Sequence, residues 1–577
     1  MKSRRGQRLH RILDDGANAS DLGFYFVVLP GLLLPLVYFH LAALKKGDRL
    51  ADIRRRWGRP RRAHVGLKSI AFYHDLRAAT RPSGRIDDQT WSDLDLDAVF
   101  RQLDHTCSAV GQQVLYDILR TPQETSEALS EKDRLVQSFA EQPGLRTAVQ
   151  AALLRLDTRN TFDLPRLFLQ DLPEIPRFYG AIPAGTLLTL AALAALFHTT
   201  GLGVLVLLFF IAGNIALGLV WRRRYSDFSV ALRSLHCLLG AGERLARLGS
   251  PAIAGQTAPL GLYCRRLRRL KKISAYLVFD DHFNEVLASA YAYLNTFLLL
   301  DLNVFLASVK MLQRHKKDIR AVYESVGRLD ALVAIASYRH SLPFYCRPQF
   351  TAPAPQLSVG QVYHPLLQDP VANSVAMEGK SLLLYGANMS GKTTFIRSLG
   401  LSAILGQTIY TCPARSYRAP FLHVQSFINR KDDILGGRSY FLAEVESVHE
   451  LVKACDGAAP CLFLVDELFK GTSPQECTAL SQAVLDYLHA SGHLVAAASH
   501  DAVLQRLLPE WAFFHFGQIM DEGVWRFDYR LRRGPGRTYN AVGLLAAKGY
   551  PAAVIRAAEK NLSAFGQYDG SFTEDDL

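Results

Sequence analysis

A glycine-rich loop between a short apolar strand and a helical segment constrains the fold of this chain more than any other feature. Residues 380–385 read KSLLLY, which predicts a buried strand, and residues 386–394 follow as GANMSGKTT. This is G-x-x-x-x-G-K-T in a strand–loop–helix context, where backbone N–H groups at a helix start bind phosphate oxygens. The pattern predicts an α/β P-loop domain that binds a nucleotide.

The residue types in this loop each suit one part of ATP. The glycines let the backbone wrap around phosphate oxygens, Lys392 is predicted to reach the β- and γ-phosphates, and the Thr393 hydroxyl is predicted to ligate Mg²⁺. The predicted nucleotide-binding residues are Gly386, Ala387, Asn388, Met389, Ser390, Gly391, Lys392, Thr393 and Thr394.

Two further apolar runs end in residues suited to phosphate chemistry. Residues 461–465 read CLFLV and precede Asp466, a predicted Mg²⁺ ligand, and Glu467, predicted to orient the attacking water. Residues 493–498 read HLVAAA and lead to His500, which can sense the γ-phosphate or be an ordinary loop histidine. Asp466 and Glu467 thus supply the metal and water contacts of a predicted ATP hydrolysis site.

A Gly-Gly-x-Ser turn lies between these strands. Residues 432–444 read DDILGGRSYFLAE, with the turn placed ahead of a predicted helix. Such a turn is a second phosphate-binding device, and it need not act on the nucleotide of its own chain. The alternative is an ordinary capped loop, and the pattern alone leaves both open.

Residues 22–44 form the first of three apolar runs with the length of a membrane span. They contain no Asp, Glu, Lys or Arg over about 23 residues, enough for a bilayer core of about 30 Å. Basic residues are denser after the run than before it, which places its downstream side in the cytoplasm. A cleaved signal peptide is the alternative, but the run is long and no clear cleavage site follows. We expect an uncleaved anchor.

Residues 180–197 and 202–220 are two more apolar runs, separated by a short turn and closed by Trp221 and three arginines. They predict a transmembrane hairpin; the alternative is a buried hairpin in a soluble core. Neither run has a polar stripe, which favours the membrane. We therefore expect about three transmembrane helices in the inner, cytoplasmic membrane, lipid contact, and all large domains in the cytoplasm.

The composition excludes several classes of protein. Of 577 residues, 49% are hydrophobic and 21% are charged, so the chain is neither a disordered tail nor a low-complexity protein. Lys and Arg number 66 against 53 Asp and Glu, and the net charge of +13 suits nucleic acid or an anionic membrane surface. The eight cysteines lack metal-ligand spacing, which predicts reduced thiols.

Two other segments leave alternatives open. Residues 265–272 read RRLRRLKK, which can bind DNA phosphates, lie on anionic lipid or face only water. Residues 285–312 are apolar but are interrupted by Asn295, Asp301 and Asn303, which favours a soluble helix over a fourth span.

The motifs together resemble the ATPase domain of the MutS family. They read GANMSGKTTFIRSLG, DDILGGRSYFLAEVE, LFLVDELFKGTS and AAASHD, in that order. The Asn-Met pair in the phosphate loop and the DEL..GTS run mark this family rather than P-loop proteins in general. Residues 94–122 are similar to the start of the family's helical lever, and residues 327–350 to its end. The likeness covers residues 90–179 and 225–562.

The resemblance implies an ATPase that works as a homodimer. In the family, each site is completed by the partner's signature serine, so Ser439 would contact the γ-phosphate across the dimer and His500 would be the switch histidine. With Lys392 and Glu467, these are the implied catalytic residues. The family also implies binding of duplex or branched DNA in mismatch repair or recombination.

The chain departs from the family in several places. Phe469 and Lys470 replace a Gly-Arg pair, which should alter the dimer-facing loop and leave the metal and water roles intact. No aromatic residue near Pro370 matches the family's adenine contact. The mismatch-reading domain is expected to be absent, which disfavours a soluble mismatch sensor. A membrane motor or scaffold that uses no DNA is therefore the alternative to a DNA-associated ATPase.

The predicted fold is an α/β P-loop NTPase domain of the ABC and MutS type preceded by an all-α lever. The predicted segments are a basic tail (1–21), an anchor (22–44), a basic linker (45–89), a first lever part (90–179), a transmembrane hairpin (180–221), a second, helical lever part (222–345) and the ATPase domain (346–577).

Overall fold

The computed structural model divides the chain into two compact units, Met1–Trp57 and Gly58–Leu577. The predicted tail and anchor, 1–21 and 22–44, lie outside the residues that the structure describes, and all elements named below belong to the second unit. The described residues are 51–52, 54–61, 65–79, 84–156, 159–172, 180–195, 201–275, 293–386, 390–428, 440–455, 457, 459–521, 524–535, 542, 545–546 and 548–568.

The predicted lever is helical, and its two ends in the sequence meet in space. Asp330, in the long helix α15 (Leu300–Ser341), accepts hydrogen bonds from the backbone N–H groups of Cys107 at 3.0 Å and Ser108 at 2.9 Å. Ser108 in turn caps the following helix. The predicted linker (45–89) contains the helix α3 (Leu67–Ala78), and α4 (Asp88–Asp93) crosses its end. The first lever part (90–179) contains α5 (Leu96–Leu103), α6 (Ala109–Arg120), α7 (Ser126–Glu141), α8 (Pro143–Leu153) and α9 (Arg166–Leu169).

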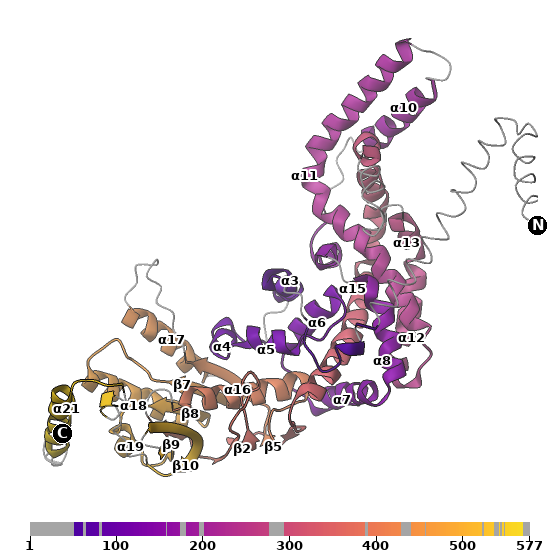
Figure 1. The fold of residues 1–577 in the computed structure, drawn as a ribbon. Coiled ribbons are helices and arrows are strands. Elements are labelled where there is room, and N and C mark those ends of the chain that lie inside the picture. Colours follow the sequence, from indigo (N-terminus) through magenta and orange to yellow (C-terminus); the bar gives the residue numbers. More distant parts are fainter. Residues whose placement is uncertain are drawn as a thin grey trace, which may run out of the picture. The chain divides into compact units, whose positions relative to one another are not determined.

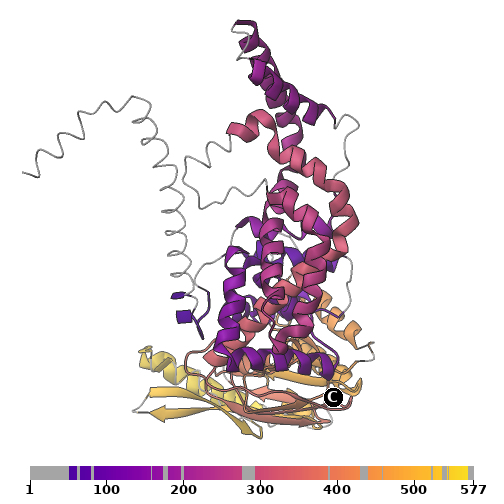
Figure 2. The ribbon, with the colours of Figure 1, turned by 90° about the vertical axis from the view of Figure 1, so that its right-hand side faces the viewer.

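The predicted hairpin is present, but its second helix is much longer than expected. Figure 1 shows α10 (Ala181–Ala195) and α11 (Gly201–Ala246) side by side. The predicted hairpin ends at residue 221, but α11 continues without a break into the second lever part, through the basic residues, for more than six further turns. No proline or glycine interrupts residues 221–239, so nothing in the backbone ends the helix there. Figure 2 shows the lever helices bundled along α11 and α15, with α12 (Ala254–Arg266) and α13 (Arg268–Ala275) beside them.

One helix in the described part of the chain is long and apolar enough to cross a membrane. It is residues Gly203–Val220 of α11, with a mean hydropathy of 2.5 and only 17% of its residues buried. Its neighbour α10 is apolar but shorter, and the third predicted span, 22–44, lies outside the described residues. Among the described residues there is thus one helix of spanning length, where the sequence predicted about three in the whole chain.

The ATPase domain contains the predicted α/β fold, with two sheets. The larger has the strand order β10-β9-β4-β8-β7-β6, and β6, β7, β8, β4 and β9 are parallel while β10 pairs antiparallel at the edge. The smaller has the order β1-β5-β2-β3. The strands are β1 (Gln349–Phe350), β2 (Gln356–Val362), β3 (Asn373–Glu378), β4 (Leu382–Tyr385), β5 (Ser416–Ala419), β6 (His423–Phe427), β7 (Cys461–Asp466), β8 (Leu494–Ser499), β9 (Ala512–Asp521) and β10 (Val524–Arg533).

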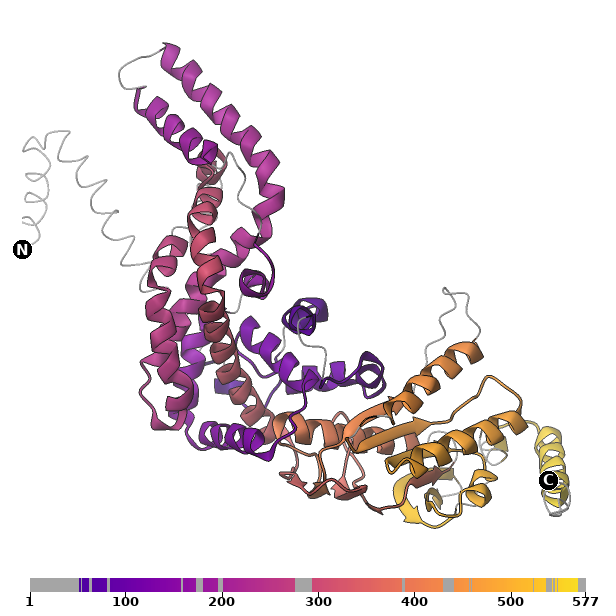
Figure 3. The same ribbon diagram turned by 180° about the vertical axis from the view of Figure 1, so that it is seen from behind.

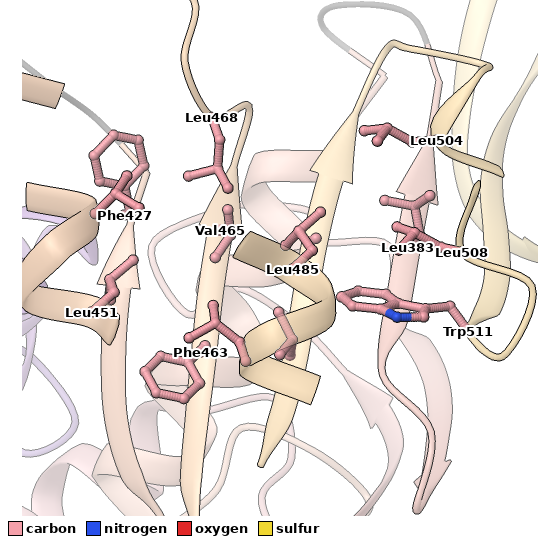
Figure 4. Packing of buried hydrophobic residues seen from close by; sticks show 14 of the residues in the cluster. Leu383, Phe427, Leu451, Phe463, Val465, Leu468, Leu485, Leu504, Leu508 and Trp511 are labelled. Carbon is pink, nitrogen blue, oxygen red and sulfur yellow. The ribbon is translucent and has the colours of Figure 1, made fainter. Parts of the chain in front are cut away.

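Helices cover the larger sheet and bury its central strands on both faces. Every residue of β4 and β8 is buried, as expected for the near-continuous apolar runs of parallel strands. Figure 4 shows part of this core, in which Phe463 and Val465 of β7 lie near Leu485. The helices of the domain are α16 (Lys392–Ile409), α17 (Tyr440–Ala454), α18 (Pro474–Ala490), α19 (Leu504–Leu507) and α21 (Ala552–Tyr568).

The lever packs directly on the ATPase domain at α16 and at the sheet edge. A Cβ atom on Gly400 of α16 would lie 2.4 Å from Leu464 of β7 and 3.1 Å from Leu94 of the lever, so glycine permits both contacts. At the edge strand β6, Asp93 of α4 accepts hydrogen bonds from the Ser426 hydroxyl at 2.8 Å and from the Ile428 N–H at 2.9 Å. The lever thus covers a strand edge that would otherwise be open to other chains.

Candidate nucleotide-binding site

The phosphate loop connects β4 to α16 through a backbone that only glycine adopts easily. Gly391 has φ of 106° and caps α16, which begins at Lys392 as the sequence predicts. A Cβ atom on Gly391 would also approach the Tyr529 ring to 3.3 Å. Ala387, Asn388 and Met389 lie outside the described residues. The first N–H groups of α16 are therefore presented at the carboxyl end of β4, where parallel sheets bind ligands.

Lys392 is directed back along the loop rather than into solvent. It is 4% exposed, and its ammonium donates a hydrogen bond to the Gly386 carbonyl at 2.5 Å. Burial lowers the pKa of Lys392, and the carboxylates of Glu467 and Asp466 partly oppose that shift. The ammonium thus places a positive charge in the lining of the cavity beside the first turn of α16, where it can meet an anionic ligand.

Thr393 and Asp466 lie together, as their shared role in a metal site predicts. The Thr393 hydroxyl donates to Asp466 Oδ2 at 2.5 Å, which joins the start of α16 to the end of β7. Burial raises the pKa of Asp466, and the hydrogen bond from Thr393 partly offsets this. A carboxylate and a hydroxyl are the oxygen ligands that Mg²⁺ takes from proteins of this type. The donor set therefore fits the predicted Mg²⁺.

Glu467 is held between Lys470 and His500. Its Oε1 contacts His500 Nδ1 at 2.9 Å, and its Oε2 forms an ion pair with Lys470 Nζ at 2.6 Å. Burial raises the pKa of Glu467, but the hydrogen bonds and charges of His500 and Lys470 outweigh it and hold that pKa at about 2. The same hydrogen bond raises the pKa of His500. Glu467 is thus an anion at every working pH, which a water-orienting group requires.

The contact with Lys470 adds to the sequence prediction. The Phe469-Lys470 departure was expected to alter the dimer-facing loop and leave the metal and water roles intact, and in the structure Lys470 also contacts the carboxylate of Glu467. Glu467 and Phe469 both have positive φ, 53° and 57°, so the chain turns back and returns Lys470 to Glu467. The Phe469 side chain is buried in the core and does not project from the loop.

Lys392, Thr393, Asp466, Glu467 and Lys470 line one cavity of about 670 Å³. Its lining also includes Pro370 and Tyr529. The cavity has the size of a site for a nucleotide-sized ligand, and the Ser390 hydroxyl beside it is buried without a hydrogen-bond partner in the described part of the chain. An acceptor such as a phosphate oxygen would satisfy that hydroxyl.

Tyr529 is the candidate base contact that the sequence did not reveal. It belongs to β10, has φ of 53°, and its ring is 47% exposed at the cavity. The side chain of Asn373 positions it, because its amide donates to the Tyr529 carbonyl at 2.9 Å and accepts from the Leu531 N–H at 2.8 Å. The partners are more than 150 residues apart in the sequence, so only the folded chain brings them together.

The segment with the Gly-Gly-x-Ser turn, called the signature turn below, is described only from Tyr440 onward. Ser439 lies outside the described residues, and α17 begins directly after it at Tyr440. Glu444, in the second turn of α17, is 1% exposed and accepts hydrogen bonds from the N–H groups of Lys470 at 3.1 Å and Gly471 at 3.3 Å. The helix that follows the signature turn is thereby tied to the loop that carries Glu467.

Comparison with known proteins identifies what this domain is similar to. Residues 382–566 match the family model of MutS domain V. The chain is 27% identical over 513 residues to the DNA mismatch repair protein MutS of Thermus aquaticus, covering 81% of this chain and 61% of that protein. It is 29% identical over 262 residues to the protein of the same name from Natronomonas pharaonis, covering 44% and 30%, respectively. The chain therefore spans less than two thirds of the length of each of these relatives.

Proposed function

Because the chain belongs to the MutS family through its domain V at residues 382–566, we propose that it binds and hydrolyses ATP with Mg²⁺. One observation carries this proposal. The Lys392 ammonium, the Thr393–Asp466 pair and the Glu467 carboxylate converge on one cavity at the carboxyl ends of neighbouring parallel strands.

Each of these groups has a role in that reaction. Lys392 would leave the Gly386 carbonyl and bind phosphate oxygens, because a phosphate is the stronger acceptor. Thr393 and Asp466 would hold Mg²⁺, which neutralises phosphate charge when bound. Glu467 would orient the attacking water, and His500, already bonded to Glu467, would respond to the γ-phosphate.

The active form is proposed to be a homodimer. The cavity carries the metal and water groups, but Ser439 belongs to a turn that, in this family, serves the partner's nucleotide. Glu444 connects the helix after that turn to the Glu467 loop, so closure of a partner on the signature turn would reach Glu467 of the same chain. ATP turnover per chain should therefore rise with protein concentration.

DNA association is proposed from the relatives' name and from a basic surface. Residues 265–272 lie on α12 and α13, and within them Arg266 pairs with Asp318 and Lys271 pairs with Glu243. The remaining basic side chains of this run, Arg265, Arg268, Arg269 and Lys272, are exposed. Four exposed cations on one surface suit duplex or branched DNA phosphates, and such binding would weaken steeply with salt.

Attachment to the cytoplasmic membrane is proposed from the hairpin of α10 and α11, with the lever and ATPase domain on the cytoplasmic side. Its outward side chains are large and apolar, and residues 181–220 contain no charged residue. Phe209 is 73% exposed and Leu219 71%, whereas an ordinary soluble helix buries such residues. This surface also favours the second candidate function, a membrane motor or scaffold that uses no DNA.

The experiment is ATP turnover by the full-length protein in lipid nanodiscs, with duplex, mismatched and branched DNA at two salt concentrations. Glu467→Gln should keep ATP binding and reduce turnover by roughly 10²- to 10⁴-fold. Glu510→Gln, an exposed carboxylate away from the cavity, is the matched control and should not change turnover.

The outcomes separate the two candidate functions. Stimulation by any DNA that falls with salt supports the DNA-associated ATPase. Turnover that ignores all DNA but requires lipid supports the membrane motor. Equal turnover by wild type and Glu467→Gln would contradict the proposed hydrolysis site itself.

A further inference from the structure

The apolar hairpin has a third member, the end of a helix that directly precedes α15. Residues 293–298 are its described part and lie beside α10 and α11, and Leu299, with φ of 51°, separates them from α15. Figures 1 and 3 both show the start of α15 next to the base of the hairpin. A buried apolar cluster of Ile182, Leu299, Leu302, Phe305 and Val309 joins them.

Two polar side chains of this three-part bundle, Thr189 and Asn214, are buried between its helices, and both take part in hydrogen bonds that join its members. Asn214 of α11 donates to the Thr189 hydroxyl of α10 at 3.0 Å and to the Phe297 carbonyl at 2.7 Å. Thr186 of α10 donates to the Leu298 carbonyl at 2.8 Å. A broken helix exposes such carbonyls, and here side chains from the hairpin satisfy them, which is the condition for irregular backbone inside a bilayer.

Gly185 allows α10 and α11 to lie close together, since a Cβ atom there would lie 2.5 Å from Asn214 Oδ1. Small residues at such positions let helices approach closely where no hydrophobic effect drives them together. The outer surface has the opposite character: Leu187, Leu205 and Leu208 are 67%, 66% and 55% exposed. Polar side chains between the helices and apolar side chains on the outer surface are the arrangement expected of a bundle surrounded by hydrocarbon.

The hydrogen bond from Asn214 to the Phe297 carbonyl also indicates how deep residues 293–298 lie along the hairpin. Asn214 lies six residues before Val220, the end of the apolar window, so it is about 9 Å inside that end of the helix at 1.5 Å per residue. The Phe297 carbonyl is bonded to it and lies at that level. Tyr293 and Leu294 belong to the same helical segment, 293–298, and are 64% and 50% exposed.

We propose, building on the membrane attachment proposed above, that the helical segment 293–298 is embedded in the lipid bilayer beside the hairpin. The hydrocarbon of the bilayer covers the outer surface of this segment. After the break at Leu299 the chain continues as α15, which carries it out of the membrane and whose other end contacts the ATPase domain. The ATPase is thereby joined to the membrane by one helix in addition to any anchor.

A benzophenone amino acid in place of Tyr293 tests this in full-length protein in phosphatidylcholine–phosphatidylglycerol nanodiscs. After irradiation, mass spectrometry identifies adducts. The same substitution at Leu208 of the hairpin is the positive control, and at Tyr487 of α18 in the ATPase domain, which is 49% exposed, the negative control. Lipid adducts at positions 293 and 208, at least tenfold above position 487, are expected.

The other outcomes test the inference and the membrane attachment separately. Lipid adducts at 208 without adducts at 293 would show that residues 293–298 lie outside the bilayer while the hairpin lies in it. Adducts at neither position would overturn both this inference and the proposed membrane attachment, while the ATP site would stand. An adduct from 293 to a second copy of the chain would show that protein, rather than lipid, covers this surface.

Discussion

Arg339, near the end of α15, should hold the lever to the ATPase domain, and its replacement gives a sharp test. Its side chain is 5% exposed and lies against the end of α16. The guanidinium donates to Asp133 Oδ1 at 2.6 Å, to the Thr411 hydroxyl at 2.8 Å, and to the carbonyls of Tyr410 at 2.9 Å and Ile409 at 3.2 Å.

The cost of Arg339→Met follows from these contacts. Three neutral acceptors lose a charged donor, at about 1 kcal/mol each. Asp133 loses one of two arginine partners but keeps Arg347, bonded to Oδ2 at 2.8 Å, so we add only about 1 kcal/mol for the ion pair. Burial of the methionine side chain restores about 1 kcal/mol of stability, so the net decrease in the local free energy of opening is about 3 kcal/mol. This is a roughly 100-fold increase in local opening.

Arg347→Met is the matched control, because Arg347 binds the same carboxylate from a side chain that is 47% exposed. Exposed pairs contribute about 0.5 kcal/mol, so local opening should rise about twofold. Amide hydrogen exchange of peptides covering 404–412 and 335–342, read by mass spectrometry, measures both variants without assuming two-state unfolding. Arg339→Lys should fall between them. Equal protection in the two methionine variants would refute the assigned role of Arg339.

Three further outcomes follow from the site. Lys392→Met should weaken Mg·ATP binding about 100-fold in calorimetric titration, because the phosphates lose a buried ammonium; unchanged affinity would contradict its role. The raised pKa of His500 means that its pair with Glu467 stabilises the protein fully below pH 6.5 and ceases to do so as pH rises through that raised pKa. The melting-temperature difference between wild type and His500→Gln should therefore be present at pH 6 and shrink by pH 9, and a constant difference would refute this. Gly391→Ala, at φ of 106° and 3.3 Å from the Tyr529 ring, should cost about 1–2 kcal/mol, measured as a lower melting temperature, and an unchanged melting temperature would contradict the assigned strain.

The local parts of the site were predictable from the sequence. The apolar runs before Gly386 and Asp466 form buried parallel strands, and α16 begins at Lys392 as expected. The strand, the loop and the helix follow each other directly in the sequence, so short-range patterns are enough to predict all three. The strand order β4-β8-β7 then brings Asp466 and His500 to the same edge as the phosphate loop.

The remaining features depend on contacts that no sequence spacing encodes. Tyr529 reaches the cavity through the pairing of β10 with β9 and through Asn373. Lys470 returns to Glu467 because two non-glycine residues, Glu467 and Phe469, adopt positive φ, a conformation that their side chains disfavour. The buried core position of Phe469 offsets that strain, and its burial is visible only in the fold.

The same helices that form the ATP site also define a mechanical path away from it. α16 begins at Lys392, and nearly all of its side chains are buried, so a displacement at its first turn cannot be absorbed within it and must appear at its other end. There Arg339 binds the carbonyls of Ile409 and Tyr410. Within α15, all of which the structure describes, His315 alone departs from helical φ and ψ.

The kink at His315 does not interrupt that path, because its neighbours fix it. His315 Nδ1 contacts Asp318 at 2.9 Å, and Asp318 is paired with Arg266 of α12 at 3.3 Å. The bend is therefore braced by a second helix, and α15 transmits displacement through it to Leu300, at the base of the hairpin. A change of nucleotide at Lys392 should then move the three-part bundle, and this movement should be smaller when the Arg339 contacts are removed.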